Sequence, residues 1–356
     1  MWAQSNPTVS IQLYSGLTIT GTLGSSYTVQ YVTNANKTNN WQTLTNVVLT
    51  TSPALWVDAS TAATADRFYR VIPTPATNAP APSGMVLIPA GSFIMGDALD
   101  GEADAPTNTE YVSAFYMDTN VVTYSFWQQV HQWAVNNGYS FDNVGAGTAN
   151  YPVQSVNWYD AVKWCNARSQ LAGVPTVYYV DAALTQIYKN VDTAPYANWS
   201  ASGYRLPTET EWEKAARGGL TACRFPWGNT ISESQANYYG DPVDFIYDLG
   251  PAGYDPIFGV GIGVDTSPAG YFPPNGYGLY DMAGNVFNWC WDWYGPYATG
   301  VQSDPHGETA GSWRILRGGS WLTGAYQART AYRNYYYPDL GDDGYGFRCV
   351  LLQAGQ

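Results

Sequence analysis

The chain has 356 residues, a net charge of −13, and 12% charged against 16% aromatic residues. Its 15 lysines and arginines form no basic stripe, which argues against nucleic acids and anionic membranes as partners. It contains no apolar run of the roughly 18 residues that a membrane span needs. The 30 tyrosines and 15 tryptophans exceed the needs of one core, so they favour an aromatic recognition surface about as much as aromatic packing.

The first 72 residues predict a small all-β module. Polar and apolar residues alternate in 9–13, 17–21 and 27–31, as in strands with one buried face, and turn residues separate these runs. A sandwich-like domain is expected, serving as a spacer or an adhesion module because no catalytic set of residues occurs in it. Residues 73–83 are a proline-rich linker, and a second domain is expected over 84–356.

Two amphipathic helices are expected early in the second domain. Thr123 has the side chain of an N-cap, and the segment that follows it ends at Gly138. Asn157 is the N-cap of a second helix, which contains Cys165 and ends near Gly173.

A third helix is expected to begin at Thr208, where Glu211 completes a capping box. Its acids Glu209, Glu211 and Glu213 resemble paired catalytic carboxylates. We interpret them instead as charges at the positive end of the helix dipole. Residues 97–104, beginning with Asp97, are rich in acids. Such a run can bind calcium, but its spacing is not that of an EF-hand loop, so a solvated acidic loop is expected.

Four ordered motifs carry a family resemblance. They occupy 85–96, 152–158, 204–219 and 271–349, and the last is a series of short apolar pieces cut by glycine, proline and asparagine. Together they resemble the formylglycine-generating enzyme (sulfatase-modifying factor) family. The resemblance implies an α+β, C-type-lectin-like, loop-rich fold for 84–356.

The same resemblance implies one disulfide, between Cys165 and Cys349. Such a bond would close a long loop and stabilise the fold by about 3–5 kcal/mol. It is typical of an oxidising compartment, so an extracellular or cell-surface location is expected. The first residues lack the charged and apolar regions of a signal peptide, which would fit a mature chain.

Catalytic cysteines are missing from this sequence. The resembled enzymes bind copper through two cysteines that follow the motif Arg317-Gly-Gly-Ser320, but here no cysteine occurs there and Thr323 stands in place of the first. A hydroxyl cannot replace a thiolate as a copper ligand. A related branch binds iron with three histidines, and this chain has only His131 and His306. The sequence therefore predicts no copper and no enzyme of the family's usual chemistry.

Calcium is the cofactor that the resemblance does imply. The run from Asp281 to Asn288 matches a family calcium loop, and hard oxygen donors at a tight turn suit this ion. The expected ligands are the side chains of Asp281 and Asn288, the carbonyls of Gly284 and Val286, and, in a less certain first loop, Asn237 and Tyr238. The alternative is a metal-free turn that Asp281 caps.

Residues 321–345 predict a binding face. Tyrosine, asparagine, aspartate and glycine provide rigid rings and hydrogen bonds at low entropic cost, and three adjacent tyrosines cannot all face a core. The stretch also resembles the variable region of retroelement-diversified proteins on this fold. The expected ligand-binding residues, with the aromatics of 287–300 beside them, are Trp321, Leu322, Thr323, Tyr326, Tyr332, Asn334, Tyr335, Tyr336, Tyr337, Asp342 and Tyr345.

The leading hypothesis is thus a non-catalytic surface or secreted protein that binds a protein or glycan. Two alternatives remain open: a structural protein that self-associates through its aromatic surface, and an enzyme with altered chemistry in the same domain.

Overall fold

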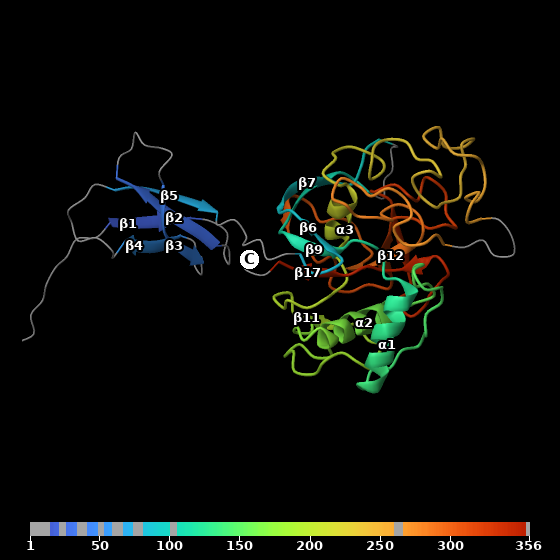
Figure 1. Cartoon of the computed structure of the whole chain (residues 1–356), viewed down its shortest axis with the longest axis horizontal. Coiled ribbons are helices and arrows are strands. Elements are labelled where there is room, and N and C mark those ends of the chain that lie inside the picture. Colours follow the sequence, from blue (N-terminus) through green and yellow to red (C-terminus); the bar gives the residue numbers. More distant parts are fainter. Residues whose placement is uncertain are drawn as a thin grey trace, which may run out of the picture. The chain divides into compact units, whose positions relative to one another are not determined.

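In a computed structural model, the described residues are 15–20, 26–33, 41–48, 53–58, 67–73, 81–99, 105–259 and 266–353. The contacts divide the chain into two units, Met1–Pro80 and Ala81–Gln353, and each is considered by itself (Figure 1). The strand predicted at 9–13 lies outside the described residues.

The N-terminal unit consists of two small antiparallel sheets. Strands β1 (Ser15–Ile19) and β4 (Ala54–Asp58) form one sheet, and β2 (Ser26–Val32) lies between β3 (Gln42–Val48) and β5 (Phe68–Pro73) in the other. Ile19 of β1 and Val29 of β2 are buried in one hydrophobic cluster. The two sheets therefore pack their apolar faces together, as the period-two pattern requires.

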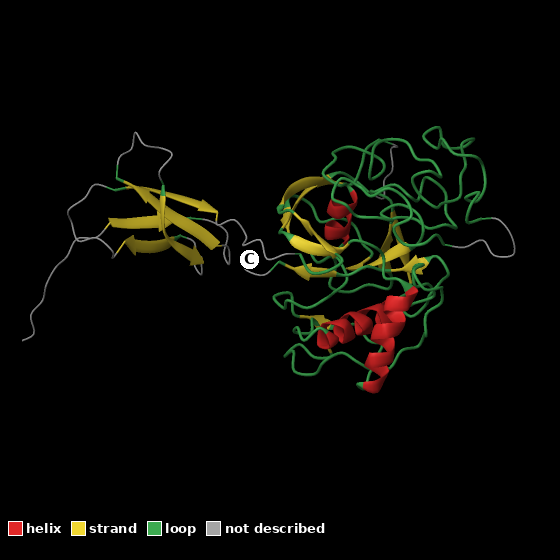
Figure 2. Cartoon of the chain, viewed as in Figure 1, coloured by secondary structure: helices red, strands yellow, loops and turns green. Residues whose placement is uncertain are grey.

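The second unit is built on short strands linked by long loops (Figure 2). Its largest sheet has the order β15-β14-β12-β16, in which β12 is antiparallel to β14 and parallel to β16. These strands are β12 (Phe287–Trp293), β14 (Arg314–Arg317), β15 (Arg333–Tyr336) and β16 (Tyr345–Gly346).

Two three-stranded sheets and one two-stranded sheet complete the described strands of this unit, in the orders β13-β8-β7, β17-β9-β6 and β10-β11. They comprise β6 (Met85–Ile88), β7 (Gly91–Met95), β8 (Asn108–Val112), β9 (Phe115–Asp118), β10 (Tyr178–Tyr179), β11 (Tyr196–Ala197), β13 (Gln302–Ser303) and β17 (Val350–Leu352).

The three predicted helices are present, with the predicted caps. Helix α1 (Tyr124–Asn136) follows Thr123, α2 (Trp158–Leu171) follows Asn157, and α3 (Glu209–Ala216) follows Thr208. Each cap side chain accepts a backbone N–H of the first turn, and at α3 the Glu211 side chain completes the capping box. No helix in the described part of the chain combines the length and apolar character needed to cross a membrane.

Helices α2 and α3 lie inside the unit rather than on it. Every residue of α3, and α2 from Trp158 to Ser169, is buried. Helix α2 packs with Trp289 and Leu316 of the large sheet, and α3 packs with the other face of that sheet through Trp212 and Ile315. The large sheet is thus covered on both faces, and only its strand ends and edge strands reach the surface.

Candidate functional site

The structure distributes the predicted binding residues over three environments. Leu322, Tyr335, Tyr337 and Asp342 are exposed, and six others are partly buried. The partly buried residues are Thr323, Tyr326, Tyr332, Asn334, Tyr336 and Tyr345. Trp321 is only 8% exposed, and its Nε1 donates to the Asp343 carbonyl at 3.2 Å. It therefore supports the surface from below instead of forming part of it, which corrects the expectation for this residue.

Four aromatic rings form a continuous row at one edge of the large sheet. Tyr335 projects from edge strand β15, with its ring centroid 4.0 Å from that of Tyr294 and 5.2 Å from that of Trp313. Trp313 in turn lies 6.1 Å from Tyr337. We call Tyr294, Trp313, Tyr335 and Tyr337 the aromatic ladder.

Strand pairing explains the aromatic ladder. Ile315 of β14 pairs with Tyr335 of β15, and Trp313 directly precedes β14 while Tyr294 directly follows β12. Trp313 is absent from the predicted binding residues, because it lies outside 321–345. The sequence feature that could have indicated Trp313 is its position directly before the run Arg314–Arg317. That position indicates a binding residue only once this run is known to pair with β15.

The remaining tyrosines of the segment extend the core. Tyr345 contacts Tyr336 at 5.3 Å between centroids, and also the buried rings of Trp289 and Phe287. Burial raises the pKa of Tyr345, with Asp342 acting in the same direction. Because these rings are held between core and solvent, they can shape a binding surface but contribute little of its exposed area.

The turn from Ser320 to Thr323, where the resemblance implied the first copper ligand would stand, is closed by hydrogen bonds. The Thr323 hydroxyl accepts the Ser320 backbone N–H at 2.8 Å and donates to the Ser320 carbonyl at 3.1 Å. The Thr323 carbonyl accepts the N–H of Tyr239 at 3.0 Å. The hydroxyl is therefore engaged in holding the turn.

The predicted calcium residues are brought together, because the Asn285 N–H donates to the Asn237 carbonyl at 2.7 Å. Asn288, however, does not fit a calcium ligand. Its Oδ1 accepts from Arg348 Nε at 2.7 Å and Trp212 Nε1 at 3.2 Å, which occupies both lone pairs, and its amide donates to the Val286 carbonyl.

Asp281 keeps a carboxylate in the same loop, with Oδ2 accepting from the Gly270 N–H and Oδ1 from Asn285. Burial raises the pKa of this carboxyl. Asp281 accepts hydrogen bonds from across this turn, and calcium binding there remains a prediction.

The three acids of α3 are each neutralised by buried arginines. Glu209 accepts two hydrogen bonds from Arg333, at 2.7 and 2.8 Å, and Glu211 accepts two from Arg205, at 2.6 and 2.7 Å. Glu213 bonds to Arg217 at 2.7 Å and also to Arg317. Such complete pairing is typical of structural ion pairs rather than of catalytic acids.

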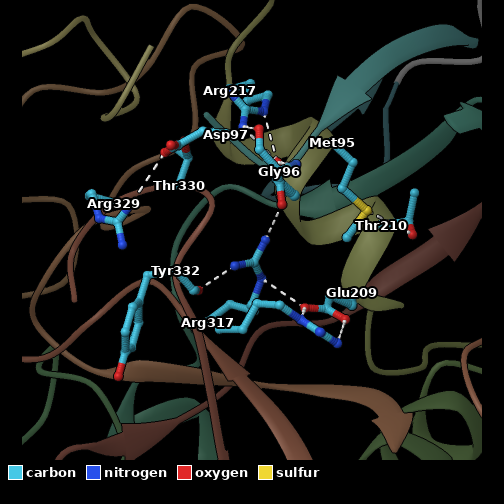
Figure 3. A network of polar contacts seen from close by, with 12 residues as sticks. Met95, Gly96, Asp97, Glu209, Thr210, Arg217, Arg317, Arg329, Thr330 and Tyr332 are labelled. Atoms are coloured by element: carbon cyan, nitrogen blue, oxygen red, sulfur yellow. Dashed lines mark hydrogen bonds and ion pairs between the residues drawn. The ribbon is translucent and has the colours of Figure 1, made fainter. Parts of the chain in front are cut away.

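The same network fixes the strand that carries the aromatic ladder. Arg317 of β14 and Arg333 of β15 are register partners, and both bind carboxylates of α3. Asp97 is buried against Arg329, with 3.4 Å between Oδ2 and Nη1, so its predicted solvated position is wrong (Figure 3). The sequence could not show this, because Asp97 and Arg329 are 232 residues apart along the chain.

Glu233 is a buried acid whose two carboxylate oxygens have no hydrogen-bond partner in the part of the chain that the structure describes. It lies against glycine backbone, since a Cβ on Gly250 would stand 1.7 Å from Oε2. Burial raises the pKa of Glu233 to about 7, and Asp248 and Asp255 act in the same direction. Folding therefore favours the protonated form of this carboxyl.

We expect Glu233→Gln to change the pH dependence of stability. The raised pKa makes the wild-type chain lose stability as pH rises from the ordinary value of 4.5 to about 7. The variant should lack this loss and be more stable by about 1–3 kcal/mol at pH 8. Urea unfolding at pH 5 and pH 8 measures it, with Asp244→Asn as the exposed control. An equal change in the free energy of unfolding between pH 5 and pH 8 in variant and wild type would contradict the raised pKa of Glu233.

The sulfatase-modifying factor enzyme 1-like domain family matches residues 71–352. The formylglycine-generating enzyme of Thermomonospora curvata is 32% identical over 297 residues, covering 75% of this chain and 93% of that enzyme. Serine/threonine-protein kinase pkn1 of Chlamydia caviae is 30% identical over 288 residues, which cover 75% of this chain but only 37% of the kinase.

Two solved structures resemble the chain. Treponema denticola variable protein 1 has a TM-score of 0.60 at 30% identity, covering 75% of this chain and 94% of that protein. CarF has a TM-score of 0.57 at 26% identity, covering 76% and 98%. The chain therefore belongs to the sulfatase-modifying factor, or formylglycine-generating-enzyme-like, family, with that family's α+β, C-type-lectin-like fold.

Proposed function

We propose that this chain is a non-catalytic binding protein that recognises a protein or glycan ligand through the aromatic ladder. The observation that carries the proposal is the exposure of its rings in one row: Trp313, Tyr335 and Tyr337 are 36%, 39% and 47% exposed. Contiguous exposed aromatic area of this kind is typical of interaction sites.

The ladder is also held rigidly, which lowers the entropic cost of binding. Arg333 lies over the ring of Tyr294, 5.0 Å from its centroid, and is itself bound by the buried carboxylate of Glu209. The ring that begins the ladder is thus anchored to helix α3 through two buried charges.

Two features support a non-catalytic role. No cysteine occurs between Cys290 and Cys349, so the copper ligands of the family's enzymes have no counterparts in this part of the sequence. The hydroxyl of Thr323, at the position of the first, is engaged with Ser320. Copper-dependent oxidation is therefore outside the proposed function.

Similarity to Treponema denticola variable protein 1 supports the idea that the face is built to vary. Tyr335, Tyr337 and Asp342 are exposed, so substitutions there would change the surface while leaving the core intact. We extend the proposal to a secreted or cell-surface location, where a Cys165–Cys349 disulfide would persist.

We expect Trp313→Ala and Tyr335→Ala each to weaken ligand binding by more than ~1 kcal/mol, which is about fivefold in affinity. The probes are soluble hexasaccharides of glucose, mannose and N-acetylglucosamine, and a displayed peptide library, with binding followed by titration calorimetry. Tyr196→Ala is the matched control, because Tyr196 is 50% exposed on β11, outside the ladder.

If both ladder variants keep the wild-type affinity for a ligand that the wild-type chain binds, the binding site does not lie on the aromatic ladder. Light scattering at rising protein concentration distinguishes the proposed binding protein from the alternative, a structural protein that self-associates. Concentration-dependent assembly that Tyr335→Ala abolishes would favour self-association over binding of a foreign ligand.

A further inference from the structure

A second, chemically different site lies at the N-terminal end of helix α3. A cavity of about 310 Å³ opens there between the ends of β7 and β12, strand β8 and the loop 295–308. We call it the acidic cavity, because four carboxylates line it: Glu110, Glu209, Asp292 and Glu308. None of the ladder's four rings belongs to its lining.

The cations that line the acidic cavity do not balance these carboxylates. Arg333 forms two hydrogen bonds with Glu209 and also donates to the Gly295 carbonyl, so the Arg333–Glu209 pair contributes little net charge. His306 is the other basic lining residue, and burial lowers its pKa, which disfavours its charged form. Glu110, Asp292 and Glu308 have no ion pair with any described residue.

Glu110 supplies the observation that points to a ligand. It is 4% exposed on β8, and its Oε1 accepts from Asn108 at 2.8 Å. Its Oε2 is buried and has no hydrogen-bond partner among the described residues, and burial raises the pKa of the carboxyl although the Gln302 backbone N–H acts in the opposite direction. The hydroxyl of Tyr297, which lines the same cavity, also lacks a partner. An unsatisfied carboxylate oxygen and an unsatisfied hydroxyl in one cavity are unfavourable unless a group that forms hydrogen bonds with them binds there.

Asp292 adds a carboxylate that the backbone holds in place. Its Oδ2 accepts the N–H of Glu209 at 2.7 Å, at the first turn of α3. Gly307 faces it with φ of +71°, and a Cβ there would stand 2.6 Å from Oδ1. Glycine at this position keeps the space beside the carboxylate open.

We propose that the acidic cavity binds a small organic cation that carries a guanidinium or primary ammonium group. Its N–H groups would donate to Glu110 Oε2, the Tyr297 hydroxyl and the Asp292 carboxylate, and Glu308 would add negative charge. Charge-assisted hydrogen bonds of this kind are among the stronger ones in proteins.

The size of the cavity favours an organic cation over a metal ion. No group of three or more acidic, histidine or cysteine side chains in the described ranges has the spacing to hold a metal ion. Carboxylates and a hydroxyl from three parts of the chain, β8, the end of β12 and the loop 295–308, line the cavity, which suits a ligand with several hydrogen-bond donors.

Calorimetric titration with butylguanidinium, and with butylurea as its neutral counterpart of the same shape, tests the proposal at pH 8. We expect butylguanidinium to bind and butylurea to fail. Glu110→Gln should weaken binding at least tenfold, while the exposed control Asp244→Asn leaves it unchanged. Lowering the pH to 5.5 should also weaken binding. Burial raises the pKa of Asp292 to about 7, so at pH 5.5 its carboxyl is protonated and no longer attracts the cation.

Tyr297→Phe provides a second variant that removes only a hydroxyl, and circular dichroism verifies that both variants fold. Equal binding of butylurea, full affinity in both variants, or no binding of butylguanidinium at millimolar concentration would each overturn the proposal. Because the cavity excludes the ladder residues, Tyr335→Ala should leave butylguanidinium binding intact.

Discussion

Arg317→Met should lower the free energy of unfolding of the 81–353 unit by about 3–5 kcal/mol, because it leaves a buried carboxylate without one of its two counter-charges. Arg317 and Glu213 are both fully buried and form an ion pair, and Arg317 also donates to the Tyr332 carbonyl. Urea unfolding followed by tryptophan fluorescence measures the loss.

A matched control and a double variant sharpen this test. Lys189→Met removes a partly exposed cation that donates to the Asn137 carbonyl and lies 4.7 Å from the ring centroid of Tyr139, and should cost less than ~1 kcal/mol. Adding Glu213→Gln to Arg317→Met should deepen the loss, because buried Arg217 then loses its own counter-charge. A loss below ~1 kcal/mol for Arg317→Met alone would show that Arg217 suffices to neutralise Glu213.

Oxidation of Cys165 and Cys349 to a disulfide should stabilise the same unit by about 3–5 kcal/mol in the chain-entropy model. Their sulfurs lie 3.5 Å apart in a fully buried position, and 184 residues separate them along the chain. The bond would join helix α2 to the segment before β17. We expect protein from an oxidising compartment to unfold at lower urea concentration once dithiothreitol is added.

Thiol counting provides the independent readout. Titration of the denatured, unreduced protein should find two free thiols, those of Cys223 and Cys290. Cys223→Ser is the control, since this partly exposed residue has no cysteine partner, and should leave stability unchanged. Four free thiols, or identical unfolding with and without reductant, would contradict the disulfide and remove the main support for an extracellular location.

Local sequence was enough for the helices and for the family. A cap such as Thr208 bonds to an N–H three residues away, so its pattern is complete within one short stretch. The four motifs likewise predicted the family and its α+β fold, because each is a contiguous run. The absence of cysteine after Arg317-Gly-Gly-Ser320 also needed only the sequence.

Tertiary structure alone decided which residues of 321–345 reach solvent. Tyr335 and Tyr336 are neighbours of the same type, yet one joins the exposed ladder and the other packs on Tyr345, because successive side chains of a strand point to opposite faces. Glu209 and Glu110 are the same residue type, but their surroundings differ. Arg333 neutralises Glu209, whereas Oε2 of Glu110 has no hydrogen-bond partner among the described residues. Burial and charge pairing depend on partners that are distant in sequence. The sequence therefore determined the scaffold and the absence of cysteine after Arg317-Gly-Gly-Ser320, while packing determined the two candidate binding sites.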